Sequence, residues 1–169
     1  MQTGVKLKRN TKRTGTISEL RVAHDLVRAG YLVSIPFGEN CRYDFVADDG
    51  CRLYRVQVKT GRLRKGVVIF NAYSSHSHRG GPTCRTYTDE IDYFAVFCGE
   101  TDATYLIPIG ELPVQVGALR VERPRNNQTS KMRWAADYLL FGGMSGACES
   151  VGNSPEGAVP NVPRSAVVA

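Results

Sequence analysis

Apolar residues between positions 17 and 27 recur at the spacing of an α-helix and predict the first regular element of the chain. The helix should begin near Thr16 and end at Gly30, because glycine commonly follows the last helical turn. A similar pattern predicts a second helix over 131–141, which Gly142 closes. The apolar face of the first helix is expected to comprise Ile17, Leu20, Val22, Ala23, Leu26 and Val27.

Runs of β-branched and aromatic residues predict strands between these helices. The run 91–98 is nearly continuously apolar, as expected of a central strand that is buried on both faces. Residues 72–88, rich in Ser, His, Gly and Arg, are expected to form a long loop. The predicted strands are 31–36, 43–48, 52–59, 67–70, 91–98 and 104–109.

The same pattern divides the chain into three parts. Residues 1–13 are basic and lack periodicity, so they are expected to form a flexible arm. Residues 14–141 alternate helix and strand signals and predict one α/β domain. Residues 142–169 are rich in small residues and proline, carry few charges, and are expected to be a disordered tail.

Asp49 and Gly50 predict a tight hairpin turn between two of the strands. A two-residue turn places Asp44 directly opposite Arg55. Since alternate residues of a strand share a face, Asp44 then lies on the same face as Gln57 and Lys59. These residues are either an ordinary ion pair beside a solvated lysine, or an acid, a carboxamide and an ammonium group gathered at one site.

Glu19 falls within the apolar arc of the first helix, where an acid is costly unless a cation or hydrogen bond compensates it. Two interpretations carry equal weight. Thr16-Ile-Ser-Glu19 has the form of a capping box, in which Glu19 bonds back to the start of the helix. Alternatively, a cation lies at the junction between the helix and the sheet.

The 169 residues carry a net charge of +6, and the charges are unevenly distributed. Basic residues concentrate in 1–13, 52–65 and 120–133, whereas 86–119 holds acids and neither lysine nor arginine. One basic and one acidic side is typical of proteins that bind a polyanion, although a solvated surface explains it nearly as well. If the chain binds DNA, the acidic run should lie away from it.

Compartment and metal content follow from other parts of the composition. No run reaches the roughly 18–20 apolar residues of a membrane helix, and the N-terminus lacks a secretory signal, so a cytoplasmic protein is expected. Five cysteines without a CxxC pair suit a reducing compartment. His76, His78 and Cys84 lack the spacing and fourth ligand of a zinc site.

The residues gathered around the hairpin suit chemistry on a phosphodiester. Mg²⁺ in proteins takes oxygen ligands, typically one or two carboxylates plus phosphate oxygens and water. Asp44 and Glu19 can supply carboxylates, and Gln57 can supply a neutral oxygen. Lys59 can orient or deprotonate the attacking water, or stabilise charge on the phosphorus.

These residues resemble the PD-(D/E)XK nuclease superfamily, most closely its group I intron-associated endonucleases. The resemblance is carried by 15–19, by Tyr43-Asp44, by 54–60 and by 87–97, and more weakly by 134–138. It implies a restriction-endonuclease-like fold, a mixed β-sheet core flanked by helices. Tyr43 replaces the usual proline and Gln57 the usual second acid.

The resemblance also implies roles and partners. It implies a homing-endonuclease-like enzyme that uses Mg²⁺, with Mn²⁺ as a substitute, to cut double-stranded DNA. Glu19, Asp44 and Gln57 are then metal ligands and Lys59 the catalytic lysine. Since one site cuts one strand, a homo-oligomer is expected. Residues expected to contact DNA are Lys12, Arg13, Arg55, Arg62, Arg64, Lys65, Arg79 and Arg85.

Two alternatives remain open from the sequence. One is a non-catalytic nucleic-acid-binding protein on the same fold, in which Gln57 is a sign of lost activity. The other is a Holliday-junction-resolvase-like enzyme that recognises branched DNA by shape.

Overall fold

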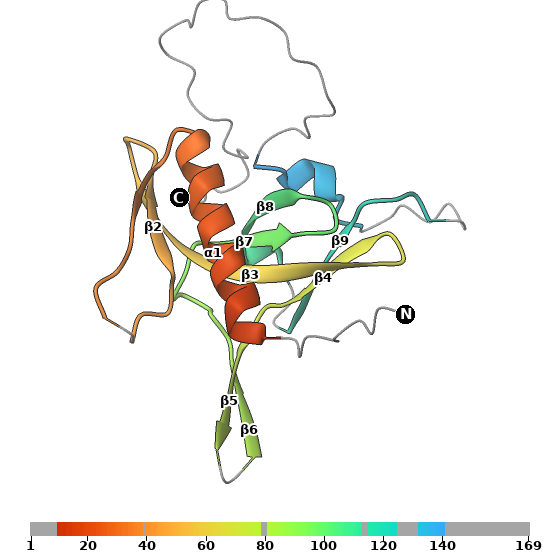
Figure 1. Cartoon of the computed structure of the whole chain (residues 1–169), viewed down its shortest axis with the longest axis horizontal. Helices are drawn as coiled ribbons and strands as arrows, with labels where there is room; N and C mark the ends of the chain where they lie inside the picture. The colour runs from red at the N-terminus through yellow and green to blue at the C-terminus, as the bar shows by residue number, and fades with distance from the viewer. Residues whose placement is uncertain (1–9, 39, 79–80, 113–114, 125–131, 141–169) are drawn as a thin grey trace, which may run out of the picture.

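Helix α1, Thr11–Arg28, packs against one face of a seven-stranded mixed sheet in the computed structural model of this chain (Figure 1). The structure describes residues 10–38, 40–78, 81–112, 115–124 and 132–140. Its sheet comprises β1 Leu32–Ser34, β2 Phe45–Asp48, β3 Leu53–Arg64, β4 Val67–Asn71, β7 Tyr93–Cys98, β8 Ala103–Pro108 and β9 Val116–Arg120.

The long strand β3 organises this sheet. It pairs antiparallel with β2 and, further along, with β4, and it pairs parallel with β7 from Val56 to Gly61. β1 lies beyond β2, β9 beyond β4, and β8 beyond β7. The short 3-10 helices η1, Ile109–Glu111, and η2, Ala135–Tyr138, lie outside the sheet.

Both faces of the sheet are covered, and β7 contributes to both. Tyr93, Ala95 and Phe97 pack with Val22 and Leu26 of α1 on one face. The alternate residues of β7 pack on the other face in a second cluster that includes β4, β8, β9 and η2. Because all six β7 residues are buried, the expectation of a central strand with two buried faces is confirmed.

Helix α1 differs from the prediction in its start and in its buried face. It begins at Thr11, with Asn10 as the N-cap that accepts a hydrogen bond from Arg13 N at 3.2 Å. Residues 11–13 of the expected arm are therefore helical, and residues 1–9 lie outside the described part. Three residues of the expected apolar face, Ile17, Leu20 and Val27, are exposed.

Two polar side chains occupy the buried face of α1 instead. Ser18 is hydrogen-bonded to Thr60 of β3 at 2.7 Å. Asp25 accepts a hydrogen bond of 2.6 Å from Thr104 of β8. Burying a polar group is tolerated when it is hydrogen-bonded, and a pattern of apolar residues cannot reveal such partners.

The hairpin between β2 and β3 has a longer loop than predicted. Val46 pairs with Arg55 and Asp48 with Leu53, so the expected register is wrong by two residues. Asp49 closes the loop by accepting hydrogen bonds from Cys51 N and Arg52 N at 2.8 and 2.7 Å. A shift of two residues keeps every side chain on its predicted face, because the period of a strand is two.

Three further segments differ in structure from the prediction. The expected loop 72–88 contains a separate hairpin, β5 Ser74–His78 and β6 Gly81–Arg85, which projects away from the sheet (Figure 1). Strand β9 was not predicted. The expected helix 131–141 is wrong over the residues described, which hold η2 alone, because β-bridges join Trp134 to Arg120 and Leu139 to Tyr105.

Two further expectations concern the ends of the chain and membranes. The predicted tail, 142–169, lies outside the described residues. Among the described helices, none is long and apolar enough to cross a membrane.

Candidate active site

Glu19 is placed by the residue before it in α1. Ser18 Oγ donates to Thr14 O at 3.1 Å and is bonded to Thr60 Oγ1, which ties this turn of the helix to β3. The side chain of Glu19 is exposed and lies at the edge of the helix–sheet junction. Since the N-cap is Asn10, Glu19 is not part of a capping box, and that interpretation is wrong.

Asp44 lies just before β2 and is held by the backbone of β3. Its N–H donates to Val56 O at 2.9 Å, and its Oδ2 accepts from Val58 N at 2.6 Å and from Gln57 Nε2. Burial raises the pKa of Asp44 above its usual value, and the nearby Glu19 charge raises it further. The hydrogen bond from the Val58 N–H acts in the opposite direction. Asp44 is thus bonded to Gln57 rather than paired with Arg55.

Lys59 extends from β3 on the same face as Gln57, as predicted. Its Nζ donates to Tyr87 Oη at 2.9 Å and to Tyr73 O at 3.3 Å. Burial lowers the pKa of Lys59 to about 8, although the Asp44 carboxylate acts in the opposite direction. Lys59 is therefore a half-buried cation within the field of Asp44, and not a solvated strand-end lysine.

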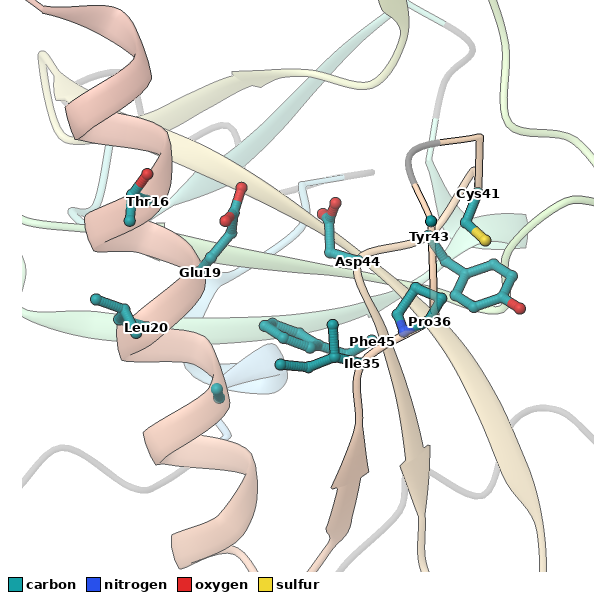
Figure 2. A pocket seen from close by; sticks show the side chains of 11 residues that line it. Thr16, Glu19, Leu20, Ile35, Pro36, Cys41, Tyr43, Asp44 and Phe45 are labelled. Atoms are coloured by element: carbon teal, nitrogen blue, oxygen red, sulfur yellow. The ribbon is translucent and has the colours of Figure 1, made fainter.

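Figure 2 shows Glu19 and Asp44 facing the same pocket, between α1 and the chain that leads into β2. The pocket has a volume of about 370 Å³. Apolar side chains form much of its wall, among them Leu20, Ile35 and Pro36. The two carboxylates thus share a space that is large enough for a metal ion with bound water.

The donor set of this pocket fits a hard divalent cation incompletely. Asp44 and Glu19 line the pocket with two carboxylates, whereas Gln57 and Lys59 are not among its lining residues. Gln57 adjoins it through the hydrogen bond from its amide nitrogen to Asp44, which leaves its Oε1 as a further oxygen. In the described part of the chain, no cluster of three or more His, Cys, Asp or Glu residues is placed to hold a metal. If a divalent cation binds here, substrate and water oxygens would complete its coordination, as is usual for Mg²⁺.

Arg42 and Tyr87 lie beside these residues and were not predicted as site residues. The guanidinium of Arg42 lies 4.2 Å from the centroid of the Tyr87 ring. Arg42 and Asp44 both lie before β2, which begins at Phe45, so the two-residue period of a strand offers no signal for Arg42. Tyr87 begins the segment 87–97 that carries the family resemblance, but nothing in the sequence relates it to Lys59, which it meets through tertiary folding.

The basic residues expected to contact DNA fall into two groups. Arg55 pairs with Asp92 at 3.1 Å, and Arg85 pairs with Glu90. Glu90 and Asp92 of the acidic run 86–119 thus lie among basic residues near the site, and the structure does not separate the two signs of charge there. Charge segregation does not support a polyanion partner here.

The second group has no acidic partner among the described residues. Lys12, Arg13, Arg64 and Lys65 are exposed, Arg62 is half-buried, and no salt bridge is formed by any of them within the described ranges. Arg62 lines a second pocket together with Thr14 and Ile17 of α1, which places β3 beside the start of the helix. Arg79 lies outside the described residues.

Comparison with solved structures supports this fold. The bacterial homing endonuclease I-Ssp6803I matches with a TM-score of 0.64 and 20% sequence identity, over 78% of this chain and 89% of that one. At this identity the likeness shows the fold, and it confirms the restriction-endonuclease-like class predicted from the sequence. None of the curated proteins matches the chain significantly.

The sequence itself matches a family model over most of its length. The model describes a PD-(D/E)XK endonuclease and matches residues 9–141, which include Glu19, Asp44, Gln57 and Lys59. The resemblance to the PD-(D/E)XK nuclease superfamily is thereby confirmed. This chain belongs to the PD-(D/E)XK endonuclease family.

Proposed function

We propose that this chain is a Mg²⁺-dependent endonuclease that hydrolyses phosphodiester bonds in double-stranded DNA. The position of Asp44 is the observation that supports this most strongly. Asp44 shares a pocket with Glu19, accepts a hydrogen bond from Gln57, and lies within the field of Lys59. A carboxylate pair beside a half-buried lysine is the set of groups that metal-assisted phosphodiester hydrolysis needs.

Asp44 and Glu19 would hold the metal ion, with Gln57 Oε1 as the third protein oxygen. Oδ2 of Asp44 accepts both of its hydrogen bonds, and the described part of the chain provides none to Oδ1, so Oδ1 is available as a ligand. When bound, Mg²⁺ supplies positive charge that polarises the phosphate and acidifies a bound water.

Lys59 acts at the reacting phosphate. Its ammonium group donates hydrogen bonds, so it orients the attacking water and stabilises the negative charge that develops on the phosphorane oxygens. The burial that lowers its pKa also excludes water, which strengthens these interactions. The expected products carry a 5′-phosphate and a 3′-hydroxyl.

The proposal also covers the class of activity, the oligomeric state and the cellular compartment. The structural neighbour is a bacterial homing endonuclease, and we extend that class of activity, including association with group I introns, to this chain. One site per chain cuts one strand, so double-strand cleavage uses a homo-oligomer. The chain acts in the cytoplasm, where free cysteines such as Cys41 and Cys51 stay reduced.

Cleavage of a randomised duplex library tests the proposal without knowledge of the target. The purified chain is incubated with the library in Mg²⁺, Mn²⁺ or EDTA, and cleaved ends are captured and sequenced. We expect a Mg²⁺-dependent set of recurring ends and none in EDTA. The isosteric Asp44→Asn variant should lose roughly 10³-fold in rate, since metal assistance provides several kcal/mol.

Other outcomes distinguish the remaining candidates. Full cleavage by Asp44→Asn would reject the site. Salt-dependent binding without nicking in Mg²⁺ or Mn²⁺ would instead support a non-catalytic nucleic-acid-binding protein. Cleavage of four-way junctions, with intact duplexes left uncut, would support a Holliday-junction-resolvase-like enzyme.

A further inference from the structure

The ammonium group of Lys59 is held by groups outside the four predicted site residues. Its Nζ donates to Tyr87 Oη at 2.9 Å and to the backbone oxygen of Tyr73 at 3.3 Å, and it lies 4.5 Å from the centroid of the Tyr87 ring. A lysine side chain is a flexible four-carbon stem, so without such contacts its nitrogen samples many positions. Tyr87 contributes the shorter of the two hydrogen bonds.

Tyr87 is itself firmly placed. Only 5% of its surface is exposed, and its ring packs edge-on against Phe94 of β7 with centroids 5.4 Å apart. The guanidinium of Arg42 lies over the same ring at 4.2 Å. An arginine stacked on a tyrosine ring is attracted to it both as a cation and as a flat surface.

Arg42 also joins the two chain segments that lead into and out of the β5–β6 hairpin. Its Nη1 donates to Ser74 Oγ at 2.8 Å, and its Nη2 donates to Thr86 O at 2.8 Å. Its Nε pairs with Glu90 at 2.6 Å. Ser74 follows Tyr73 and Thr86 precedes Tyr87, so Arg42 ties together the neighbours of both groups that contact Lys59.

We propose that Tyr87 and Arg42 are positioning residues for Lys59, Tyr87 through its hydroxyl and Arg42 through Tyr87 and the two segments that it joins. The proposal rests on the proposed nuclease function, in which Lys59 meets the phosphate. Neither residue needs to contact the substrate.

Tyr87→Phe tests the direct part of the proposal, because it removes the hydroxyl and keeps the ring that packs on Phe94 and Arg42. We expect the single-turnover cleavage rate, at saturating DNA and Mg²⁺, to fall about tenfold, the effect of losing one hydrogen bond to a charged group. The dissociation constant for DNA should not change.

Arg42→Lys tests the indirect part. Lysine keeps the positive charge and loses the planar group that stacks on Tyr87 and bonds Ser74 and Thr86 together. We expect a fall in rate similar to that of Tyr87→Phe. The matched control is Tyr105→Phe, which removes another buried tyrosine hydroxyl, bonded to Thr101 at 3.0 Å, and should leave the rate unchanged.

A second measurement reads the position of Lys59 without any cleavage. In protein labelled with [¹³C]lysine, free of metal and DNA, the side-chain resonances of Lys59 are assigned by their loss in Lys59→Arg. The rings of Tyr87 and Phe94, with centroids 4.5 and 6.0 Å from Nζ, should shift these resonances away from those of exposed lysines. We expect them to move toward exposed lysines in Tyr87→Phe and in Arg42→Lys, and to stay in Tyr105→Phe.

The two measurements separate the positioning role from the nuclease function. Unmoved Lys59 resonances in Tyr87→Phe and Arg42→Lys would overturn the proposal, and so would an equal loss of cleavage in Tyr105→Phe. If the unaltered protein does not cut DNA, the nuclease function fails, and the resonances still decide whether Tyr87 and Arg42 hold Lys59.

Discussion

The backbone N–H of Val58 donates a hydrogen bond of 2.6 Å to Oδ2 of Asp44. Val58 lies between Gln57 and Lys59 on β3, so the acid is tied to the strand that carries both of these residues. On its other edge β3 is paired with β7 from Val56 to Gly61. The spacing of acid, amide and lysine therefore depends on paired strands, which is the rigid support that a catalytic site requires.

Glu19→Gln should remove metal-dependent cleavage without loss of stability. The side chain is exposed and does not cap α1, so the free energy of unfolding should change by less than about 0.5 kcal/mol. Asn10→Ala is the matched change, because it removes the true N-cap and should cost about 1 kcal/mol. Urea denaturation measures the free energy of unfolding of both variants. An equal loss of stability in the two would show that Glu19 has a structural role.

Lys59→Met should be more stable than the unaltered protein at neutral pH. Burial lowers the pKa of Lys59 to about 8 from 10.5, so the charge destabilises the folded state at pH 7, by up to about 3 kcal/mol. Between pH 8 and 10.5, Lys59 is protonated in the unfolded state and largely neutral in the folded state. The free energy of unfolding of the unaltered protein therefore rises with pH relative to that of the variant. The advantage of Lys59→Met should therefore shrink over that interval.

Denaturation at pH 7, 9 and 10.5 checks this dependence on pH. Lys59→Met should also be unable to cut DNA, so stability and activity change in opposite directions. An advantage that stays constant from pH 7 to 10.5 would show that Lys59 is not a buried cation.

Gly61→Ala should destabilise the fold, since a Cβ at this position lies 2.8 Å from Val68 Cγ1 and 2.9 Å from Val96 Cγ1. Overpacking of this kind costs roughly 1–3 kcal/mol. Gly15→Ala is the control, because it lies within α1 with nothing inside 4 Å of the added Cβ. That change should stabilise by about 1 kcal/mol, and thermal unfolding should shift the two variants in opposite directions.

Arg64→Gln and Lys65→Gln should weaken DNA binding in a salt-dependent way. Both side chains are exposed and lack acidic partners among the described residues, so each is free to meet a phosphate. Loss of one phosphate contact lowers the slope of log K against log salt by about 1.

Arg55→Gln provides the comparison. Arg55 is bonded to Asp92 and to Asp89 O, so its loss should reduce stability by up to about 1 kcal/mol and change the salt slope little. Fluorescence anisotropy over a range of salt concentrations measures the slopes. A larger change in the salt slope for Arg55→Gln than for Arg64→Gln would show that Arg55, and not Arg64, contacts the phosphates.

The face shared by Asp44, Gln57 and Lys59 could be predicted because it depends only on the two-residue period of a strand. The turn prediction was wrong by two residues in register, and the shared face survived because the error was an even number. The predicted partner of Asp44 was wrong, since Asp44 is bonded to Gln57 and not paired with Arg55. The buried face of α1 was missed for a related reason, because Ser18 and Asp25 find partners on β3 and β8.

The sequence by itself determined the strands of the core other than β9, the family, and the residues that share one face of β3, because these follow from local periodicity and from motifs contiguous in the chain. Only the tertiary structure decided what surrounds Lys59. Tyr87 meets Lys59, and Arg42 lies over the Tyr87 ring, from segments far apart in sequence. Glu90 and Asp92 likewise pair with basic residues that are distant in the chain. Contacts of this kind depend on packing across elements, which no local pattern encodes.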